Sequence, residues 1–140
     1  MNSETITVET RINAPVSKVW ACFTEPSHIT DWSNASPDWH TPRAENDLKV
    51  GGRFLTRMEA RDGSAGFDFT GIYTEITPHE SIAYVMDGDD ARKAINTFKA
   101  EGEATRVTTV FDREHENSIE MQRAGWQSIL DNLKRHVESE

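Results

Sequence analysis

The chain has 140 residues, 36% of them hydrophobic, and its 24 acidic and 15 basic side chains give a formal net charge of −9 at pH 7. This charge disfavours nucleic acid as a partner, and the absence of any run of about 18 apolar residues excludes a membrane-spanning helix. The single cysteine, Cys22, permits no internal disulfide, and the N-terminus lacks the basic and apolar regions of a secretory signal. We therefore expect one soluble, cytoplasmic domain over residues 1–140.

The first segments of the chain predict a strand and then a short helix. Residues Thr5–Asn13 alternate and are rich in β-branched side chains, which is typical of a strand. Pro15 suits the first position of a helix, and apolar residues at helical spacing extend that helix over Val16–Phe23. Pro26 is expected to end it.

A second short helix and a long loop are expected next. Ser27 can cap a helix that runs through Ile29 to Trp32. Residues Ser33–Leu48 show no period and contain prolines and short polar residues, so we expect a loop, interrupted by a short strand around residues 43–45.

The central part of the chain predicts consecutive antiparallel strands. Turn residues separate short alternating segments, and Asp62-Gly63 is a strong hairpin signal. The expected strands are Arg53–Arg61, Phe67–Thr77, Ser81–Met86, Lys93–Ala100 and Thr105–Phe111.

Residues 117–137 predict one long amphipathic helix. Asn117 is its expected cap, and Glu120 three residues later completes a variant of the capping box. Gly125 lies within the helix, where glycine costs roughly 1 kcal/mol relative to alanine, and we interpret it as a point where backbone or ligand approaches closely. The apolar positions recur at spacings of three and four: Trp126, Ile129, Leu130, Leu133 and Val137.

The order of these elements predicts an α+β fold. A strand, two short helices, about six further strands and a long helix require a mainly antiparallel sheet covered by the last helix. We expect a curved sheet of about six or seven strands, and a long helix laid across such a sheet can close a cavity.

Motifs along nearly the whole chain match those of a known family. They are Ala14-Pro15 with Val19-Trp20, Pro26 through Asp31-Trp32, Leu48 with Gly51-Gly52-Arg53-Phe54, Gly71 with Glu75 and Pro78, and Gly125-Trp126 with Leu130-Asp131-Asn132-Leu133. In this order they resemble the Hsp90-ATPase-activator-like (AHSA1-type) branch of the START/Bet v 1-like (SRPBCC) superfamily.

The resemblance implies a helix-grip fold, in which a curved antiparallel sheet wraps a long C-terminal helix and leaves a cavity between them. Relatives include lipid and hormone carriers, polyketide cyclases, co-chaperone domains and bacterial proteins without known activity. The fold therefore does not select one function. No catalytic residue set is carried over by the resemblance, and an Hsp90-type chaperone is one partner that it implies.

Histidine and cysteine positions give no metal-binding pattern in the sequence. A metal site needs several convergent ligands, and the histidines are scattered with no close pair on one helical or strand face. We therefore expect neither a metal nor a cofactor, and we interpret Cys22 as a buried structural thiol. The histidines are His28, His40, His79, His115 and His136.

Large aromatic side chains are the main functional signal. They either fill the core between sheet and helix or line an apolar cavity whose polar groups orient a ligand. Under the second interpretation the protein binds a small apolar or aromatic molecule. The candidate ligand-binding residues are Trp32, Trp39, His40, Met58, Phe67, Phe69, Tyr84, Phe98, Met121 and Trp126.

Two other functions are alternatives to ligand binding. One is a cyclase- or hydrolase-type enzyme in which His40 acts with Asp38, Glu59 or Asp68 as general acid and base. The other is a protein-interaction or co-chaperone-like module with an exposed apolar patch. A homodimer is also open, because Thr105–Phe111 alternates in a way that suits an edge strand.

Overall fold

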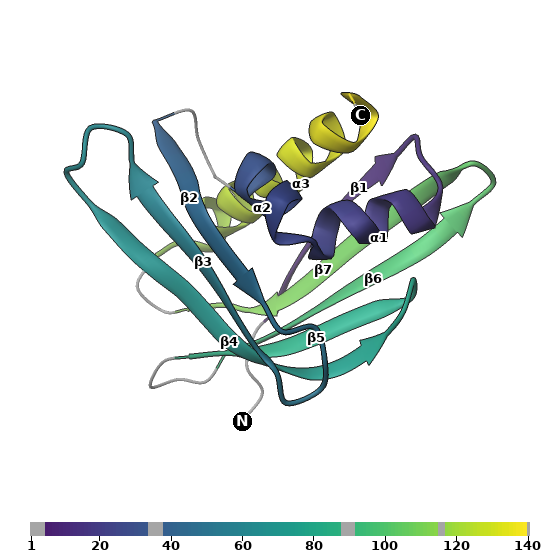
Figure 1. Cartoon of the computed structure of the whole chain (residues 1–140), viewed down its shortest axis with the longest axis horizontal. Helices are drawn as coiled ribbons and strands as arrows, with labels where there is room; N and C mark the ends of the chain where they lie inside the picture. The colour runs from purple at the N-terminus through teal and green to yellow at the C-terminus, as the bar shows by residue number, and fades with distance from the viewer. Residues whose placement is uncertain (1–4, 34–37, 88–91, 115–116, 140) are drawn as a thin grey trace.

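A curved, seven-stranded antiparallel sheet and three helices form the structure (Figure 1), here a computed structural model that describes residues 5–33, 38–87, 92–114 and 117–139. The long helix lies against the concave side of the sheet, and the two short helices cross nearby. The predicted α+β fold and helix-grip arrangement are therefore confirmed. Within these residues no helix is both long and apolar enough to cross a membrane.

The chain order of the elements agrees closely with the order predicted from periodicity. The elements are β1 (Thr5–Ile12), α1 (Val16–Thr24), α2 (Pro26–Trp32), β2 (Trp39–Asn46), β3 (Arg53–Ala60), β4 (Gly66–Thr77), β5 (Ser81–Met86), β6 (Lys93–Glu101), β7 (Ala104–Asp112) and α3 (Ile119–Ser139). The strand order across the sheet is β1-β7-β6-β5-β4-β3-β2.

The two edges of the sheet are β1 and β2, so the prediction that Thr105–Phe111 lies at an edge is wrong. These residues belong to β7, which is hydrogen-bonded between β1 and β6. Ile6 pairs with Phe111, which brings the beginning of the chain beside its last strand. The alternation of β7 arises because its inward residues face the core, and it carries no information on neighbouring strands.

The segment expected to be a loop contains the full edge strand β2. It pairs with β3 from Trp39↔Ala60 to Asn46↔Phe54, with an irregularity between His40 and Arg43. Proline and charged side chains are tolerated on an edge strand because one side has no ladder to maintain. The same residues hide the strand from a search for alternating apolar positions.

The starts of two helices differ from the prediction. α2 begins at Pro26 with Glu25 at the N-cap, so the expected cap at Ser27 is wrong. Proline is favoured at this first position because its missing N–H has no partner there anyway. In α3 the Ser118 hydroxyl accepts a backbone N–H three residues later (3.1 Å), whereas Asn117 donates instead to the Glu114 carboxylate.

The C-terminal half of α3 is part of the hydrophobic core. Leu133 and Val137 have no exposed surface, and Leu130 is 4% exposed. They belong to the same buried cluster as Val8 and Ile12 of β1, which α3 contacts along its length. The predicted apolar stripe is therefore the face that α3 buries.

Polar side chains of α3 also cover the edge of the sheet at β1. Gln127 Nε2 donates to the Glu9 carbonyl oxygen (3.0 Å), and Lys134 Nζ donates to the Arg11 carbonyl oxygen (2.8 Å). Backbone groups on an edge strand otherwise invite pairing with another chain. The helix thus supplies intramolecular partners to part of this edge.

Gly125 does not mark a close approach of backbone within the described protein, so that half of the interpretation is wrong, whereas the approach of a ligand stays a prediction. A Cβ atom built at Gly125 meets no atom of the described protein within 4 Å, outside its own helix. The helix therefore bears the conformational cost of glycine without a packing reason in the chain itself.

We predict that Gly125→Ala stabilises the protein by roughly 1 kcal/mol, because alanine is the better helix former and has room for its methyl group. Ala124→Gly, on an exposed neighbouring position of the same helix, is the matched control and should cost a similar amount. Urea denaturation followed by circular dichroism measures both. A loss of stability in Gly125→Ala would contradict the open space found around this residue.

Candidate functional site

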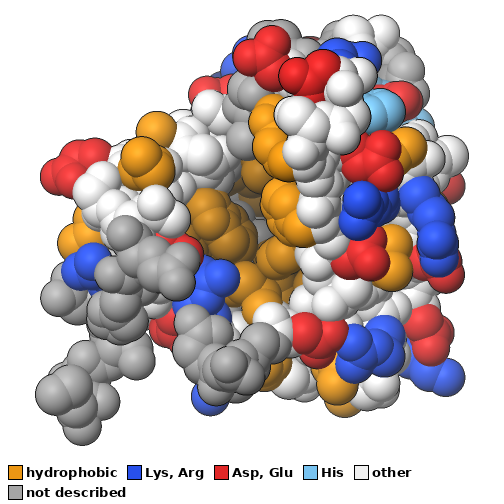
Figure 2. Space-filling model, turned by 90° about the vertical axis from the view of Figure 1, so that its left-hand side faces the viewer, with side chains coloured by type: hydrophobic (Ala, Val, Ile, Leu, Met, Phe, Trp, Pro, Cys, Tyr) orange, Lys and Arg blue, Asp and Glu red, His pale blue; other side chains and the backbone are white. Residues whose placement is uncertain are grey.

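A cavity of about 370 Å³ lies between the concave face of the sheet and α3. Figure 2 shows one face of the molecule hollowed, with hydrophobic side chains along the hollow. The lining residues come from nearly every element of the fold: α1, α2, every strand from β2 to β7, and the first half of α3. The cavity is therefore a product of the whole tertiary structure.

Aromatic rings form the middle of the cavity wall. The ring centroid of Phe54 lies 5.4 Å from that of Phe69 and 4.9 Å from that of Tyr84. Phe54 can lie flat over β4 because residue 71 is glycine: a Cβ atom at Gly71 would stand 2.7 Å from the Phe54 ring and 2.5 Å from the Val85 carbonyl oxygen. Gly71 thus sets the position of this part of the wall.

Trp126 forms the helical side of the wall and is held by a stack. Its ring lies parallel to that of Phe111, with 3.9 Å between centroids and 10° between planes. Phe69 meets Trp126 edge-on at 6.4 Å. Because Phe111 is fully buried in β7, the indole is anchored to the sheet while it lines the cavity.

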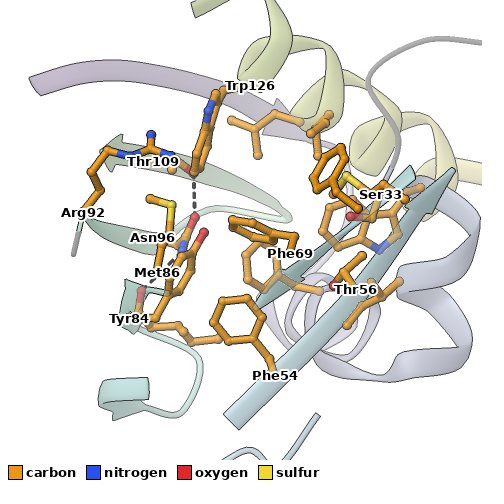
Figure 3. Close-up of a pocket in the computed structure, with 18 of the residues that line it drawn as sticks. Ser33, Phe54, Thr56, Phe69, Tyr84, Met86, Arg92, Asn96, Thr109 and Trp126 are labelled. Atoms are coloured by element: carbon orange, nitrogen blue, oxygen red, sulfur yellow. Dashed lines mark hydrogen bonds between the residues drawn. The ribbon is translucent and has the colours of Figure 1, made fainter. Parts of the chain in front are cut away.

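One end of the cavity carries polar side chains (Figure 3). Arg92, Asn96, Thr109 and Tyr84 lie there, while Phe54 and Phe69 lie between them and the opposite side of the cavity. Asn96 Oδ1 accepts a hydrogen bond from Thr109 Oγ1 (2.7 Å), a contact set by their pairing across β6 and β7. This hydrogen bond fixes the Asn96 side chain at the polar end of the wall.

Both tyrosines near the cavity are held in the neutral form. Burial raises the pKa of Tyr84 well above its ordinary value, against the opposing effect of a hydrogen bond with Asn96. Burial also raises the pKa of Tyr73 to about 12, and its hydrogen bond to Asn46 only partly offsets this. At neutral pH both hydroxyl groups therefore remain protonated donors.

Gln122 holds the chain at another margin of the cavity. Its Oε1 accepts the backbone N–H of Glu114 (2.8 Å), and its Nε2 donates to the carbonyl oxygens of Glu114 (3.1 Å) and Asn117 (2.9 Å). All three residues line the cavity. The buried amide thus fixes Glu114 and Asn117, which precede α3, at this margin of the cavity.

Six of the ten candidate ligand-binding side chains lie on the cavity wall. They come from α2, β3, β4, β5 and α3, which shows that the cavity gathers residues far apart in the sequence. The six are Trp32, Met58, Phe67, Phe69, Tyr84 and Trp126.

The other four candidates lie elsewhere. Met121 is 63% exposed on the outer side of α3, and Phe98 is buried beneath α1 in the core. Trp39 of β2 packs its ring against Phe67 of β4, two strands away, with 6.0 Å between centroids. His40 belongs to β2 instead of a loop at the cavity mouth. None of these four is among the residues that line the cavity, although Phe98 lies on the same buried face of β6 as the lining residue Asn96.

The acid–base pair expected around His40 is not on the cavity wall either. His40 Nε2 lies 3.7 Å from Glu59 Oε1, but both side chains are more than a third exposed. Asp68 pairs with Arg57 (3.3 Å), and Asp38 is exposed. This arrangement gives no support to general acid–base chemistry inside the cavity, since such chemistry needs a titratable pair that faces the substrate.

Sequence reasoning missed the polar end of the cavity, although β6 contains a signal for it. Ala94, Asn96 and Phe98 alternate on the buried face of the strand, so a polar amide occupies a core position. A buried polar side chain needs hydrogen-bond partners. Thr109 directly opposite on β7 provides one.

Two of the histidines form a close pair between different helices, which the search for a pair on one helical or strand face could not find. His28 Nδ1 lies 2.8 Å from His136 Nε2, because α2 and α3 meet although the two residues are 108 positions apart. Cys22 is buried, as expected, and its sulfur lies within 4.8 Å of a ring nitrogen of each histidine. His115 lies outside the described residues.

Comparison with known proteins identifies the family. The sequence model of the activator of Hsp90 ATPase homolog 1-like proteins matches residues 13–138, which is nearly the whole chain. The chain belongs to this family. No protein of curated function matches it.

Solved structures agree with membership of the activator of Hsp90 ATPase homolog 1-like family. An AHSA1-like protein from Aeromonas hydrophila is 43% identical, with 97% of this chain and 93% of that chain covered and a TM-score of 0.90. A protein from Cytophaga hutchinsonii is 44% identical over 96% of this chain and 92% of its own, with a TM-score of 0.82. CalU16 from Micromonospora echinospora, at 20% identity over 96% of this chain and 76% of its own (TM-score 0.73), shares the fold.

We predict that neither Tyr73 nor Tyr84 ionises in the folded protein near pH 10. Because their pKa values are raised on folding, stability is constant below the unfolded-state pKa and falls as pH rises from about 10 toward 12. Ultraviolet absorbance of tyrosinate, with circular dichroism on the same samples, separates ionisation from unfolding. Tyr73→Phe should show a shallower decline, and ionisation of either residue near pH 10 in the folded protein would contradict its burial.

Proposed function

We propose that this protein binds a small, largely apolar or aromatic molecule in the cavity between the sheet and α3. The observation that carries the proposal is the aromatic middle of the wall combined with hydrogen-bonding side chains at one end. A ligand site of this kind buries an apolar body and orients it through a few polar contacts.

The size of the cavity supports a small ligand. Its volume of about 370 Å³ is near the lower end of the roughly 300–1,000 Å³ of small-molecule sites. Phe54, Phe69 and Trp126 present faces and edges suited to a planar ring. Met58 of β3 and Met86 of β5 also line the cavity, and their side chains are flexible enough to fit ligands of slightly different shape.

The polar end supports a ligand with an acidic or hydrogen-bond-accepting group. Arg92 brings a permanent positive charge to the cavity lining, and a guanidinium is well suited to bind a carboxylate. Tyr84, kept neutral by burial, is a hydroxyl donor beside it. The proposed ligand therefore has an aromatic body and an acidic group directed toward Arg92.

The proposal places this binding in the cytoplasm, and the single cysteine, which is typical of a reducing compartment, supports this. An Hsp90-type chaperone stays a prediction of the family resemblance alone. A homodimer also stays a prediction, and it has lost the observation that suggested it, because Thr105–Phe111 is internal to the sheet.

A library of matched compounds tests the proposal: aromatic carboxylic acids, the corresponding neutral amides, and linear fatty acids. Aromatic acids are expected to raise the melting temperature, because a ligand at 100 times its dissociation constant stabilises the folded state by about 2.7 kcal/mol. Isothermal titration calorimetry on the compounds that raise it then gives the affinities. No stabilisation across all three classes would contradict the proposal.

Three variants locate the binding. Thr56→Phe fills part of the cavity and should abolish binding of acids and amides alike. Arg92→Met should weaken the acids at least tenfold and leave the matched amides unchanged, because only the acids lose a charge-assisted contact. Met121→Ala, exposed on the outer side of α3, is the control and should bind as the natural protein does. Equal binding by Thr56→Phe would contradict the proposed location.

A further inference from the structure

A second candidate site lies where the three helices meet, away from the polar end of the cavity. Cys22 belongs to α1, His28 to α2 and His136 to the last turn of α3. Each offers one ligand atom, and the three atoms lie within 4.8 Å of one another. One sulfur and two imidazole nitrogens therefore converge on a single point.

The distances suit a tetrahedral metal ion. Zinc binds nitrogen at about 2.0–2.1 Å and sulfur at about 2.3 Å, so tetrahedral geometry requires about 3.3 Å between two nitrogens and about 3.6 Å between nitrogen and sulfur. The two imidazole nitrogens, His28 Nδ1 and His136 Nε2, are 2.8 Å apart, sharing a hydrogen bond. The ring centroids are 5.0 Å apart, so the two nitrogens face each other nearly head-on. A separation of about half an ångström more, together with a turn of each ring that directs its lone pair at a shared point, would admit the ion.

The shared hydrogen bond shows how the metal would enter. One facing nitrogen carries the shared proton and the other accepts it through its lone pair, so both nitrogens are directed into the same space. For both to act as ligands, the donor imidazole releases this proton to solvent and takes one up on its other ring nitrogen, which leaves the ring neutral. The metal ion then binds the lone pairs of both facing nitrogens. The Cys22 thiol loses its proton to solvent as the sulfur–metal bond forms, so metal binding releases protons.

The surroundings position the ligands without help from a metal. Trp32 Nε1 donates to the Cys22 carbonyl oxygen (2.8 Å), and the rings of Phe23 and Trp32 stack with centroids 5.5 Å apart. These contacts fix the corner between α1 and α2. Cys22 is 2% exposed, whereas both histidines are partly exposed, which leaves the histidine side open to an incoming ion.

We propose that Cys22, His28 and His136 bind a zinc ion, with a water molecule as the fourth ligand. A thiolate with two imidazoles favours zinc over magnesium or calcium, which prefer oxygen ligands. The ion would join α2 to α1 and α3. Because Ile29 and Trp32 of α2 line the cavity, the zinc site would also hold that part of the cavity wall in place.

Cobalt(II) is the probe, because it adopts the same geometry as zinc and has a visible spectrum. The full chain is freed of metal with a chelator and titrated with cobalt(II). We expect one ion per chain, visible bands of tetrahedral cobalt, and a near-ultraviolet thiolate-to-cobalt charge-transfer band. Added zinc should displace the cobalt and remove these bands.

Variants assign the ligands. Cys22→Ser should lose the charge-transfer band, and Cys22→Ser and His136→Gln should each weaken metal binding by more than the roughly 10–100-fold typical of outer-shell changes. His40→Gln, on edge strand β2 and outside the cluster of Cys22, His28 and His136, is the matched control and should keep the spectrum and the affinity. Circular dichroism establishes that each variant is folded.

The natural protein alone can overturn the proposal, even if a variant does not fold. Binding without a thiolate band, or no cobalt binding at micromolar protein concentration, would refute a site that contains Cys22. Equal losses in His40→Gln and His136→Gln would refute the assignment of His136. None of these outcomes depends on whether the cavity binds an organic ligand, so the two proposals are tested independently.

Discussion

The parallel stack of Trp126 on Phe111 joins α3 to the sheet at the point where close packing gives way to a cavity. Toward the C-terminus of the helix, Leu133 and Val137 are fully buried in the core. Toward its N-terminus, Gln122 borders the cavity and holds the preceding loop through its amide. One helix is therefore core along half of its length and cavity wall along the other half. The stack fixes the indole against the sheet at this boundary, since an aromatic pair contributes about 0.5–1.5 kcal/mol beyond its buried area.

The polar end of the cavity is formed before any ligand arrives. Asn96 and Thr109 face each other because of the register between β6 and β7, and their hydrogen bond fixes the amide. Burial raises the pKa of Tyr84 beside them well above its ordinary value. Under the proposed function, these preorganised polar groups reduce the ordering cost of binding. Ligand specificity would then depend on strand register as well as on the lining residues.

Local patterns predicted most of the fold, and contacts between distant segments account for what they missed. Alternation and helical spacing located β1, the strands from β3 to β7, and α3 correctly. Of edge strand β2, only a short piece around residues 43–45 was predicted, because its charged residues and Pro42 follow no apolar period. Of the candidate site, residues in regular alternation such as Phe69 reached the cavity, whereas the pairing of His28 with His136 depends on how α2 meets α3. A contact between two helices far apart in the sequence produces no periodic pattern of residues, because it depends on the angle at which the helices pack.

The covered edge of β1 has a consequence for how the chain folds. β1 pairs in the sheet only with β7, roughly a hundred residues later in the sequence, and two carbonyl groups on its outer edge, those of Glu9 and Arg11, accept hydrogen bonds from α3, which follows β7. The pairing of β1 with β7 cannot form until β7 has been made, and the hydrogen bonds from α3 to β1 cannot form until the last helix has been made. Such non-local pairings slow folding, because loop-closure entropy must be overcome before the contacts form. During synthesis, β1 therefore stays unpaired until β7 has been made, and its outer edge stays uncovered until α3 follows.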